Sequence, residues 1–174
     1  MESGQTISFS IALAIAISSA LLSAALYFEH FHNILPCKLC TLQRYPHAIT
    51  IVLGIISLSF RNQIGFLASI LAFGLMTVGT LLAGYHAGIE LQLWAGPNSC
   101  ENRPINFGLS AEKMLEKIQQ TPITACNRVT WSFLTLSMAG WNTLFSACLT
   151  FLWGFATKRT YEKFNSQFSS SASQ

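Results

Sequence analysis

Residues 7–28 have the sequence ISFSIALAIAISSALLSAALYF, a run of 22 positions without a charged side chain. An α-helix rises about 1.5 Å per residue, so about 20 apolar residues cross the roughly 30 Å hydrocarbon core of a bilayer. Residues 64–85 form a second charge-free run, and residues 129–157 form a third. These three runs predict an integral membrane protein of the all-α class.

The composition of the 174-residue chain agrees with a membrane location. Charged residues make up 10% of the chain and hydrophobic residues 51%, whereas soluble domains contain roughly 25% charged residues. So few charges cannot cover the surface of a soluble protein, and a net charge of +3 offers no basic patch for a polyanion. We therefore expect membrane lipid around the chain, no nucleic-acid partner, and no ordinary cytosolic enzyme.

A fourth span is less clear, because the uncharged run at residues 48–60 has only 13 positions. Extending this run toward the N-terminus takes in Arg44, Pro46 and His47. Pro46 is tolerated in a first helical turn, where its missing N–H would have no helical partner. We therefore predict a four-helix membrane bundle, with spans at about 7–28, 43–60, 64–85 and 130–157.

Four spans place both termini on one side of the membrane, and loops at about 29–42 and 86–129 on the other. The side that holds the termini has slightly more basic residues near the span ends. These are Arg61, Lys158, Arg159 and Lys163, whereas the other side has Lys38, Arg44 and Arg128. The positive-inside rule therefore places the termini in the cytoplasm. Apolar spacing over residues 110–119 predicts a short amphipathic helix in the longer loop, and we expect the Ser-rich tail at 166–174 to be disordered.

Four of the five cysteines fall in these two loops. Cys37 and Cys40 form a Cys-Lys-Leu-Cys motif at the mouth of the second span, and Cys100 and Cys126 lie near the two ends of the longer loop. Disulfides persist in oxidising compartments outside the cytoplasm, which agrees with the orientation expected from the basic residues. Cys148 lies inside the last span, where we expect a small buried apolar side chain.

The Cys-x-x-Cys motif is typical of redox disulfides, but zinc sites use it too. Redox chemistry needs a stabilised thiolate, and here a helix is predicted to begin just after Cys40, with Arg44 one turn further on. A zinc site would need Cys37, Cys40, Cys100 and Cys126 together, although zinc ligands usually come as two close pairs. We therefore expect no bound metal. Cys100 and Cys126 could also simply staple the long loop, which a disulfide would stabilise by roughly 3 kcal/mol.

Two cysteine pairs on one side of a membrane can also form an electron relay by thiol–disulfide exchange. A relay that ends at the bilayer surface needs an acceptor. The sequence has neither a haem-attachment motif nor a glycine-rich dinucleotide fingerprint. A lipid-soluble quinone can reach this depth, and Arg44 and His86 could donate hydrogen bonds to its carbonyl oxygens.

The chain resembles the disulfide bond formation protein B family of bacterial inner membranes from about residue 7 to residue 158. Three stretches carry the resemblance: PCKLCTLQRYP at 36–46, YHAGIE at 85–90, and CNRVTWSFLTLSMAGWN at 126–142. In the first stretch the family pattern is Cys-x-x-Cys, with Arg four residues on. Two departures are modest: Gln43 stands where some members carry an acid, and Lys38 adds a positive charge between the motif cysteines.

The resemblance implies an enzyme that reoxidises a periplasmic thioredoxin-like dithiol oxidase of the DsbA type and passes the electrons to ubiquinone or menaquinone. By position, Cys100 is implied to form the mixed disulfide with this partner. Cys126 is implied to resolve that bond and then to exchange with Cys37. Cys40 resembles the thiolate that meets the quinone, and Arg44 resembles the arginine that orients it.

His86 matches a histidine in the third span of the family and is a second candidate for quinone binding. Two other classes stay open. A vitamin-K-epoxide-reductase-like enzyme is also quinone-linked, but there the loop cysteines precede a Cys-x-x-Cys in a late span. A non-catalytic membrane protein with structural disulfides, or an assembly factor held by zinc, would need no quinone.

Overall fold

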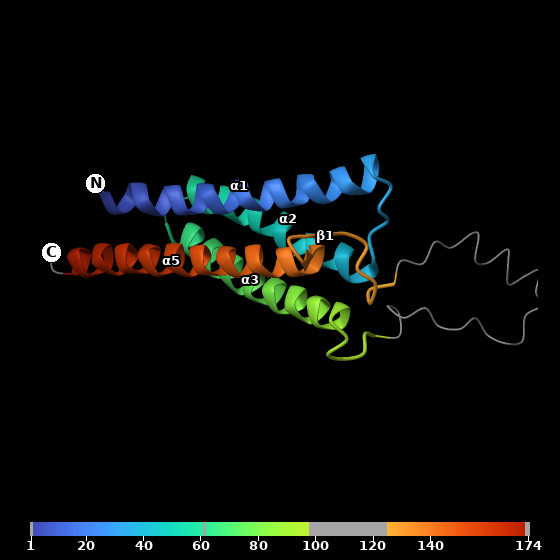
Figure 1. The fold of residues 1–174 in the computed structure, drawn as a ribbon. Coiled ribbons are helices and arrows are strands. Elements are labelled where there is room, and N and C mark those ends of the chain that lie inside the picture. The colour runs from blue at the N-terminus through green and yellow to red at the C-terminus, as the bar shows by residue number, and fades with distance from the viewer. Residues whose placement is uncertain (1, 61, 98–124, 173–174) are drawn as a thin grey trace, which may run out of the picture.

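The computed structural model describes residues 2–60, 62–97 and 125–172. It contains a bundle of four long helices: α1 (Glu2–Phe31), α2 (Lys38–Ser59), α3 (Gln63–Glu90) and α5 (Met138–Ala172). In this bundle α1 packs against α2 and α5, and α3 packs against the same two helices. Both chain termini lie at one end, and the α1–α2 connection lies at the other (Figure 1). The predicted all-α four-helix arrangement is therefore confirmed.

Three of the helices in the described ranges are long and apolar enough to cross a membrane. They are α1 from Gly4 to Phe31, α2 and α3. The fourth helix, α5, is less apolar, because its first turns include Asn142, Thr143 and Ser146. The core between the helices combines small and large side chains, namely Ile11, Ala14, Ala72, Met76, Leu149, Trp153 and Ala156.

The last helix begins at Met138, eight residues after the predicted start of the fourth span at residue 130. The intervening residues form a small antiparallel hairpin, in which β1 (Ser132–Phe133) pairs with β2 (Leu136–Ser137). Its turn holds Leu134 and Thr135 at φ of 50° and 67°, a backbone conformation that no helix contains. A charge-free run does not distinguish a helix from a strand by its length alone, so the sequence could not place this boundary.

The C-terminal end of α5 also differs from the prediction. The helix continues to Ala172, whereas the Ser-rich residues 166–174 were expected to be disordered. Extending an existing helix by one residue costs much less free energy than nucleating a new helix. A long helix can therefore continue through moderate helix formers such as serine. The short helix predicted at residues 110–119 lies outside the described residues.

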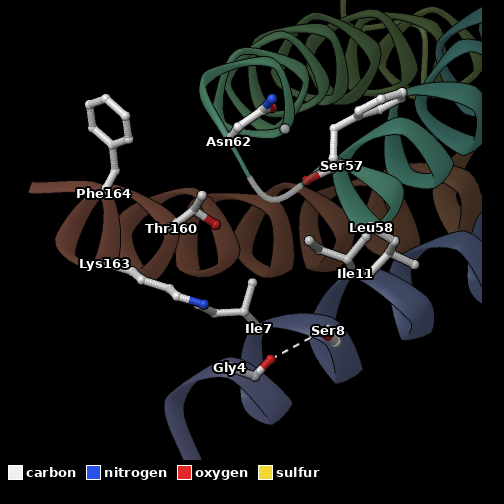
Figure 2. Close-up of a pocket in the computed structure, with 12 residues that line it drawn as sticks. Gly4, Ile7, Ser8, Ile11, Ser57, Leu58, Asn62, Thr160, Lys163 and Phe164 are labelled. Atoms are coloured by element: carbon white, nitrogen blue, oxygen red, sulfur yellow. Dashed lines mark hydrogen bonds between the residues drawn. The ribbon is translucent and has the colours of Figure 1, made fainter. Parts of the chain in front are cut away.

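The end of the bundle that holds the termini is tightly packed. A cavity of about 50 Å³ lies there among α1, the α2–α3 turn and α5. Figure 2 shows side chains from all three regions around it, with Lys163 reaching from α5 toward Ile7 on α1. Such a volume holds a few waters but no organic ligand. Any site for a larger molecule must therefore lie elsewhere in the described structure.

Candidate functional site

The Cys37–Cys40 pair lies at the beginning of α2. Cys37 is the N-cap of this helix, and its extended backbone turns the chain into the first helical turn. Its sulfur accepts a hydrogen bond from the backbone N–H of Cys40 at 3.1 Å, and the two sulfurs are 2.6 Å apart. Both cysteines are free thiols in this structure. A helix N-terminus favours a thiolate because its unpaired N–H groups point at the sulfur.

These interactions lower the pKa of Cys37 from about 9 to about 4. The largest cause is the hydrogen bond from the Cys40 thiol, and the histidine ring of His86 adds to it. Burial of the Cys37 sulfur opposes the shift, because a charged group loses solvation when it is buried. The resemblance implied a thiolate at Cys40. In the reduced pair of this structure the lowered pKa favours a thiolate at Cys37, and the role of Cys40 at the quinone stays a prediction.

Cys126 lies beside this pair, although 89 positions of sequence separate it from Cys37. The Cys37 sulfur, the Cys126 sulfur and a ring nitrogen of His86 all lie within 4.8 Å of one another. Cys126 is 1% exposed and is part of a disulfide. A zinc ligand must be a thiolate, so a disulfide at Cys126 favours redox chemistry over a zinc site here. Cys100 lies outside the described residues, and its role stays a prediction.

His86 connects the cysteines to the interior of the bundle. It lies on α3 and is 3% exposed. Its Nε2 atom is 3.6 Å from the Cys37 sulfur and 4.0 Å from the carboxylate of Glu90, one turn further along the helix. Its Nδ1 atom accepts a hydrogen bond from the side-chain amide of Gln43 at 3.0 Å. His86 is therefore placed next to the cysteine sulfurs, whereas the sequence suggested a position near the membrane surface and a candidate role in quinone binding.

Arg44 points into the protein and pairs with the carboxylate of Glu29 on α1 at 2.5 Å. The two side chains are about a quarter exposed. A guanidinium group carries five N–H donors, so one bond to Glu29 leaves others available. Sequence analysis did not identify Glu29 as a site residue. The signal available was an acidic residue at the end of an otherwise charge-free span.

A cavity of about 500 Å³ lies next to the cysteines. Its polar end is formed by the two thiols with Gln43, Arg44, His86 and Glu90. Its remaining walls are mostly apolar and aromatic, with Leu21, Leu22, Phe28, Trp131, Trp141 and Phe145 among them. Ligand sites typically have this volume and this contrast between apolar walls and a few convergent polar groups. The cavity suits a planar ring with polar substituents and an apolar tail.

Two further residues of the cavity wall, His47 and Asn142, were not identified from the sequence as parts of the site. The sequence suggested that His47 lies at the membrane interface, but it is 4% exposed within the bundle. Polar residues within a predicted span usually face the protein interior, and this rule could have found both. Cys148, expected to be buried, is instead exposed on the surface of α5.

Comparison with known proteins gives one consistent result. The family model described as "Disulfide bond formation protein DsbB" matches residues 8–156. The chain is 32% identical over 161 residues to disulfide bond formation protein B of Marinobacter nauticus, covering 86% of this chain and 90% of the relative. It is 31% identical over 148 residues to the protein of the same name in an Azoarcus species, covering 79% of this chain and 86% of the relative. No solved structure matches the chain.

Proposed function

The chain belongs to the disulfide bond formation protein B family, and from this membership we propose that it is a quinone-dependent protein-dithiol oxidase of the bacterial inner membrane. In this proposal it reoxidises a periplasmic thioredoxin-like protein of the DsbA type and passes the electrons to ubiquinone or menaquinone. Both termini face the cytoplasm and the redox cysteines face the periplasm.

The observation that carries this proposal is the position of Cys126 beside Cys37, within 4.8 Å between sulfur and sulfur. Thiol–disulfide exchange requires one sulfur to reach another directly, because each step is an attack of a thiolate on a disulfide sulfur. A disulfide whose role is only to close the long loop does not need to lie against a second cysteine pair. The proximity favours a relay over two independent structural bonds.

The first exchange takes electrons from the partner. A thiolate of the reduced partner attacks Cys100 in a Cys100–Cys126 disulfide, and Cys126 leaves as a thiolate. The second thiol of the partner then attacks the partner's own sulfur in the mixed disulfide, so the oxidised partner departs and Cys100 is released as a thiolate. Two electrons and two protons have left the partner's dithiol, and one disulfide has been gained and one lost.

The second exchange moves the electrons to the membrane pair. The Cys126 thiolate attacks Cys37 in a Cys37–Cys40 disulfide, and Cys40 leaves. Cys100 then attacks Cys126, which restores the loop disulfide and releases Cys37 as a thiolate. Burial of Cys37 and Cys126 keeps outside thiols away from this step.

The last step returns the Cys37–Cys40 dithiol to a disulfide. The Cys37 thiolate closes on the Cys40 sulfur, and two electrons and the one remaining thiol proton leave the pair; the second proton that a quinol needs comes from water. A bound quinone supplies the acceptor for the electrons and protons and is released as the quinol. Arg44 and His86 line the cavity beside Cys40. Arg44 would hold the ring through hydrogen bonds to its oxygens, and His86 would do so only through the Nε2–H that faces the Cys37 sulfur in the reduced pair. The apolar walls would hold the isoprenoid tail of the quinone.

The proposal is tested by quinone reduction with purified protein in detergent, using a reduced DsbA-type protein as the donor. We expect turnover that is lost when any one of Cys37, Cys40, Cys100 or Cys126 is replaced by serine. Cys148→Ala is the matched control and should turn over normally, because Cys148 lies on the outer surface of α5.

One variant separates the two halves of the relay. Cys100→Ser should abolish oxidation of the partner while added quinone still oxidises the Cys37–Cys40 pair. If the wild-type protein shows no turnover and both pairs resist the donor and mild reductant, the bonds are structural and the catalytic proposal is wrong.

A further inference from the structure

A chain of four side-chain hydrogen bonds runs from His47 on α2 through Asn142 on α5 to the Cys37 sulfur. His47 Nε2 is 3.2 Å from Asn142 Oδ1, and Asn142 Nδ2 is 2.7 Å from Gln43 Oε1. Gln43 Nε2 is 3.0 Å from His86 Nδ1, and His86 Nε2 is 3.6 Å from the Cys37 sulfur. The chain therefore joins three helices through residues up to 99 positions apart. The enzymatic steps proposed above use His86 but neither Gln43 nor Asn142.

The direction of each bond follows from the chemistry of the groups. The amide nitrogen of Gln43 can only donate, so His86 Nδ1 must accept, and a neutral ring then carries its proton on Nε2. That proton faces the Cys37 sulfur. The amide of Asn142 donates to Gln43 in the same way, and its oxygen accepts from Nε2–H of His47. All four donors therefore point along the chain toward Cys37.

Most of this chain is shielded from solvent, and Asn142 is half-buried at the cavity wall. Gln43 is 6% exposed, and the two histidines are buried to a similar extent. Within a low-dielectric interior, hydrogen bonds that point in one direction polarise one another and strengthen the terminal donor. A buried amide that lost its partner would remain unsatisfied at a cost in free energy, so alternative orientations of the Gln43 amide are disfavoured. The terminal donor is thus fixed by residues that never touch the cysteines.

We propose that Gln43 and Asn142 are positioning residues, which hold His86 in the tautomer whose Nε2–H donates to the Cys37 sulfur. This inference rests on the proposed function in taking Cys37–Cys40 as a redox pair. A donor aimed at Cys37 stabilises the thiolate of the reduced pair. Stabilising the reduced form raises the reduction potential of the pair, so it accepts electrons more readily from the reduced Cys100–Cys126 pair of the loop.

The other groups near Cys37 do not depend on this chain. In the described structure they include the Cys40 thiol on α2, the carboxylate of Glu90 on α3, which lies 4.0 Å from His86, and the Arg44 guanidinium, which lines the same cavity. His86 also forms a hydrogen bond with the backbone of Cys126. Cys126 is in a disulfide and does not titrate. A change that acts only on the hydrogen-bond chain should therefore shift the Cys37 thiolate without removing the contribution of Cys40.

Two variants break the chain in different ways. Gln43→Leu removes the donor to His86. Asn142→Asp is nearly isosteric but offers only acceptors, so the Gln43 amide must rotate and present its oxygen to His86. The histidine proton then moves to Nδ1, and a lone pair faces the Cys37 sulfur. Thr150→Val is the matched control, because it breaks another bond between α3 and α5, the 2.9 Å contact of Thr80 with Thr150.

The measurement uses full-length protein in detergent, with Cys100→Ser, Cys126→Ser and Cys148→Ala present in every sample so that only Cys37 and Cys40 titrate. Thiolate absorbance at 240 nm is followed against pH, and the pair is equilibrated with a dithiothreitol redox buffer without quinone. We expect both chain variants to raise the thiolate midpoint by about one pH unit. The equilibrium constant should shift about tenfold toward the disulfide, which is about 30 mV for a two-electron couple.

Thr150→Val should match the unchanged background in both readouts. The inference would be overturned if both Gln43→Leu and Asn142→Asp kept the acid dissociation constant of the thiol and the redox equilibrium constant within twofold of the background values. This holds even if quinone turnover is intact. Shifted values in a protein that fails to reduce quinone would support the inference and contradict the proposed function. The two ideas can therefore fail separately.

Discussion

At the scale of single residues, Cys37 is where the stabilising interactions of the site converge. It caps α2, accepts hydrogen bonds from Cys40 and lies beside His86 and Cys126. Each of these contacts favours a negative sulfur or an exchange with another sulfur. A residue that must be both attacked and released in a relay needs this combination.

The lowered pKa of Cys37 predicts how the reduced protein responds to pH. Its pKa falls from about 9 to about 4 on folding. The stabilisation is therefore complete above pH 9 and is lost as the pH falls through about 4. We expect the difference in melting temperature between the reduced wild type and reduced Cys37→Ala to shrink steadily between pH 8 and pH 4. A difference that does not depend on pH would contradict a thiolate at Cys37.

Arg44 should matter for the quinone more than for the protein partner. Arg44→Ala removes a charged donor from the polar end of the cavity, and such a bond contributes about 1.5–3 kcal/mol. We expect the apparent KM for quinone to rise about tenfold or more, with little change in the KM for the DsbA-type donor.

Arg159→Ala is the control for Arg44→Ala, because Arg159 forms an exposed pair with Glu162 far along α5. Exposed pairs of this kind contribute little to stability. Unchanged quinone kinetics in Arg44→Ala would remove its assigned role and leave it as the structural partner of Glu29.

The sequence predicted site residues unequally, for a physical reason. The Cys-x-x-Cys spacing is itself typical of redox and metal sites, so Cys37 and Cys40 could be identified from spacing alone. Gln43 and Asn142 carry no such signal, because their role arises only when α2 folds against α5. A contact between residues 99 positions apart has no periodicity that a single sequence reveals.

At the scale of elements, a glycine in the first turn of α3 allows this helix to pack closely against the turn that precedes it. A Cβ atom added at Gly65 would lie 1.7 Å from the backbone oxygen of Phe60, whereas one added at Gly74 would meet nothing within 4 Å. Both glycines lie in α3. The pair therefore separates the cost of crowding from the general effect of replacing glycine in a helix.

We expect Gly65→Ala to destabilise the protein by about 1–3 kcal/mol or more, since the backbone of the turn must move to make room. Gly74→Ala should be neutral or stabilising by up to about 1 kcal/mol, because alanine is the better helix former. Thermal unfolding in detergent measures both. Equal melting temperatures for the two variants would show that the α2–α3 turn is not tightly packed.

Element boundaries were the part of the fold that the sequence predicted least well. The long charge-free runs identified three of the four helices, because crossing a bilayer demands length and apolarity. The helix α2 was predicted only by extending a shorter apolar run through Arg44. They did not show that residues 132–137 form a hairpin before α5. This hairpin matters for the site, since it begins six residues after Cys126 and contributes Phe133 to the cavity wall.

At the scale of the whole molecule, the two ends of the bundle differ in chemistry. One end holds both termini and the small cavity, and the other holds the described redox cysteines and the large cavity (Figure 1). A relay that serves periplasmic proteins works only if the cysteine end faces the periplasm, because the cytoplasm keeps thiols reduced. The basic residues favour this orientation by a narrow margin, so it needs a direct test.

Single cysteines introduced at the two ends decide the orientation. The native cysteines are first replaced. Leu93→Cys then places one cysteine at the end of the bundle that holds the redox site, and Glu162→Cys places one near the C-terminal end of α5. Both wild-type side chains are at least about half exposed. We expect a membrane-impermeant maleimide to label Leu93→Cys in intact spheroplasts, and Glu162→Cys only after the membrane is permeabilised. The reverse pattern would place the redox pairs in the cytoplasm, where no oxidised periplasmic partner could be regenerated.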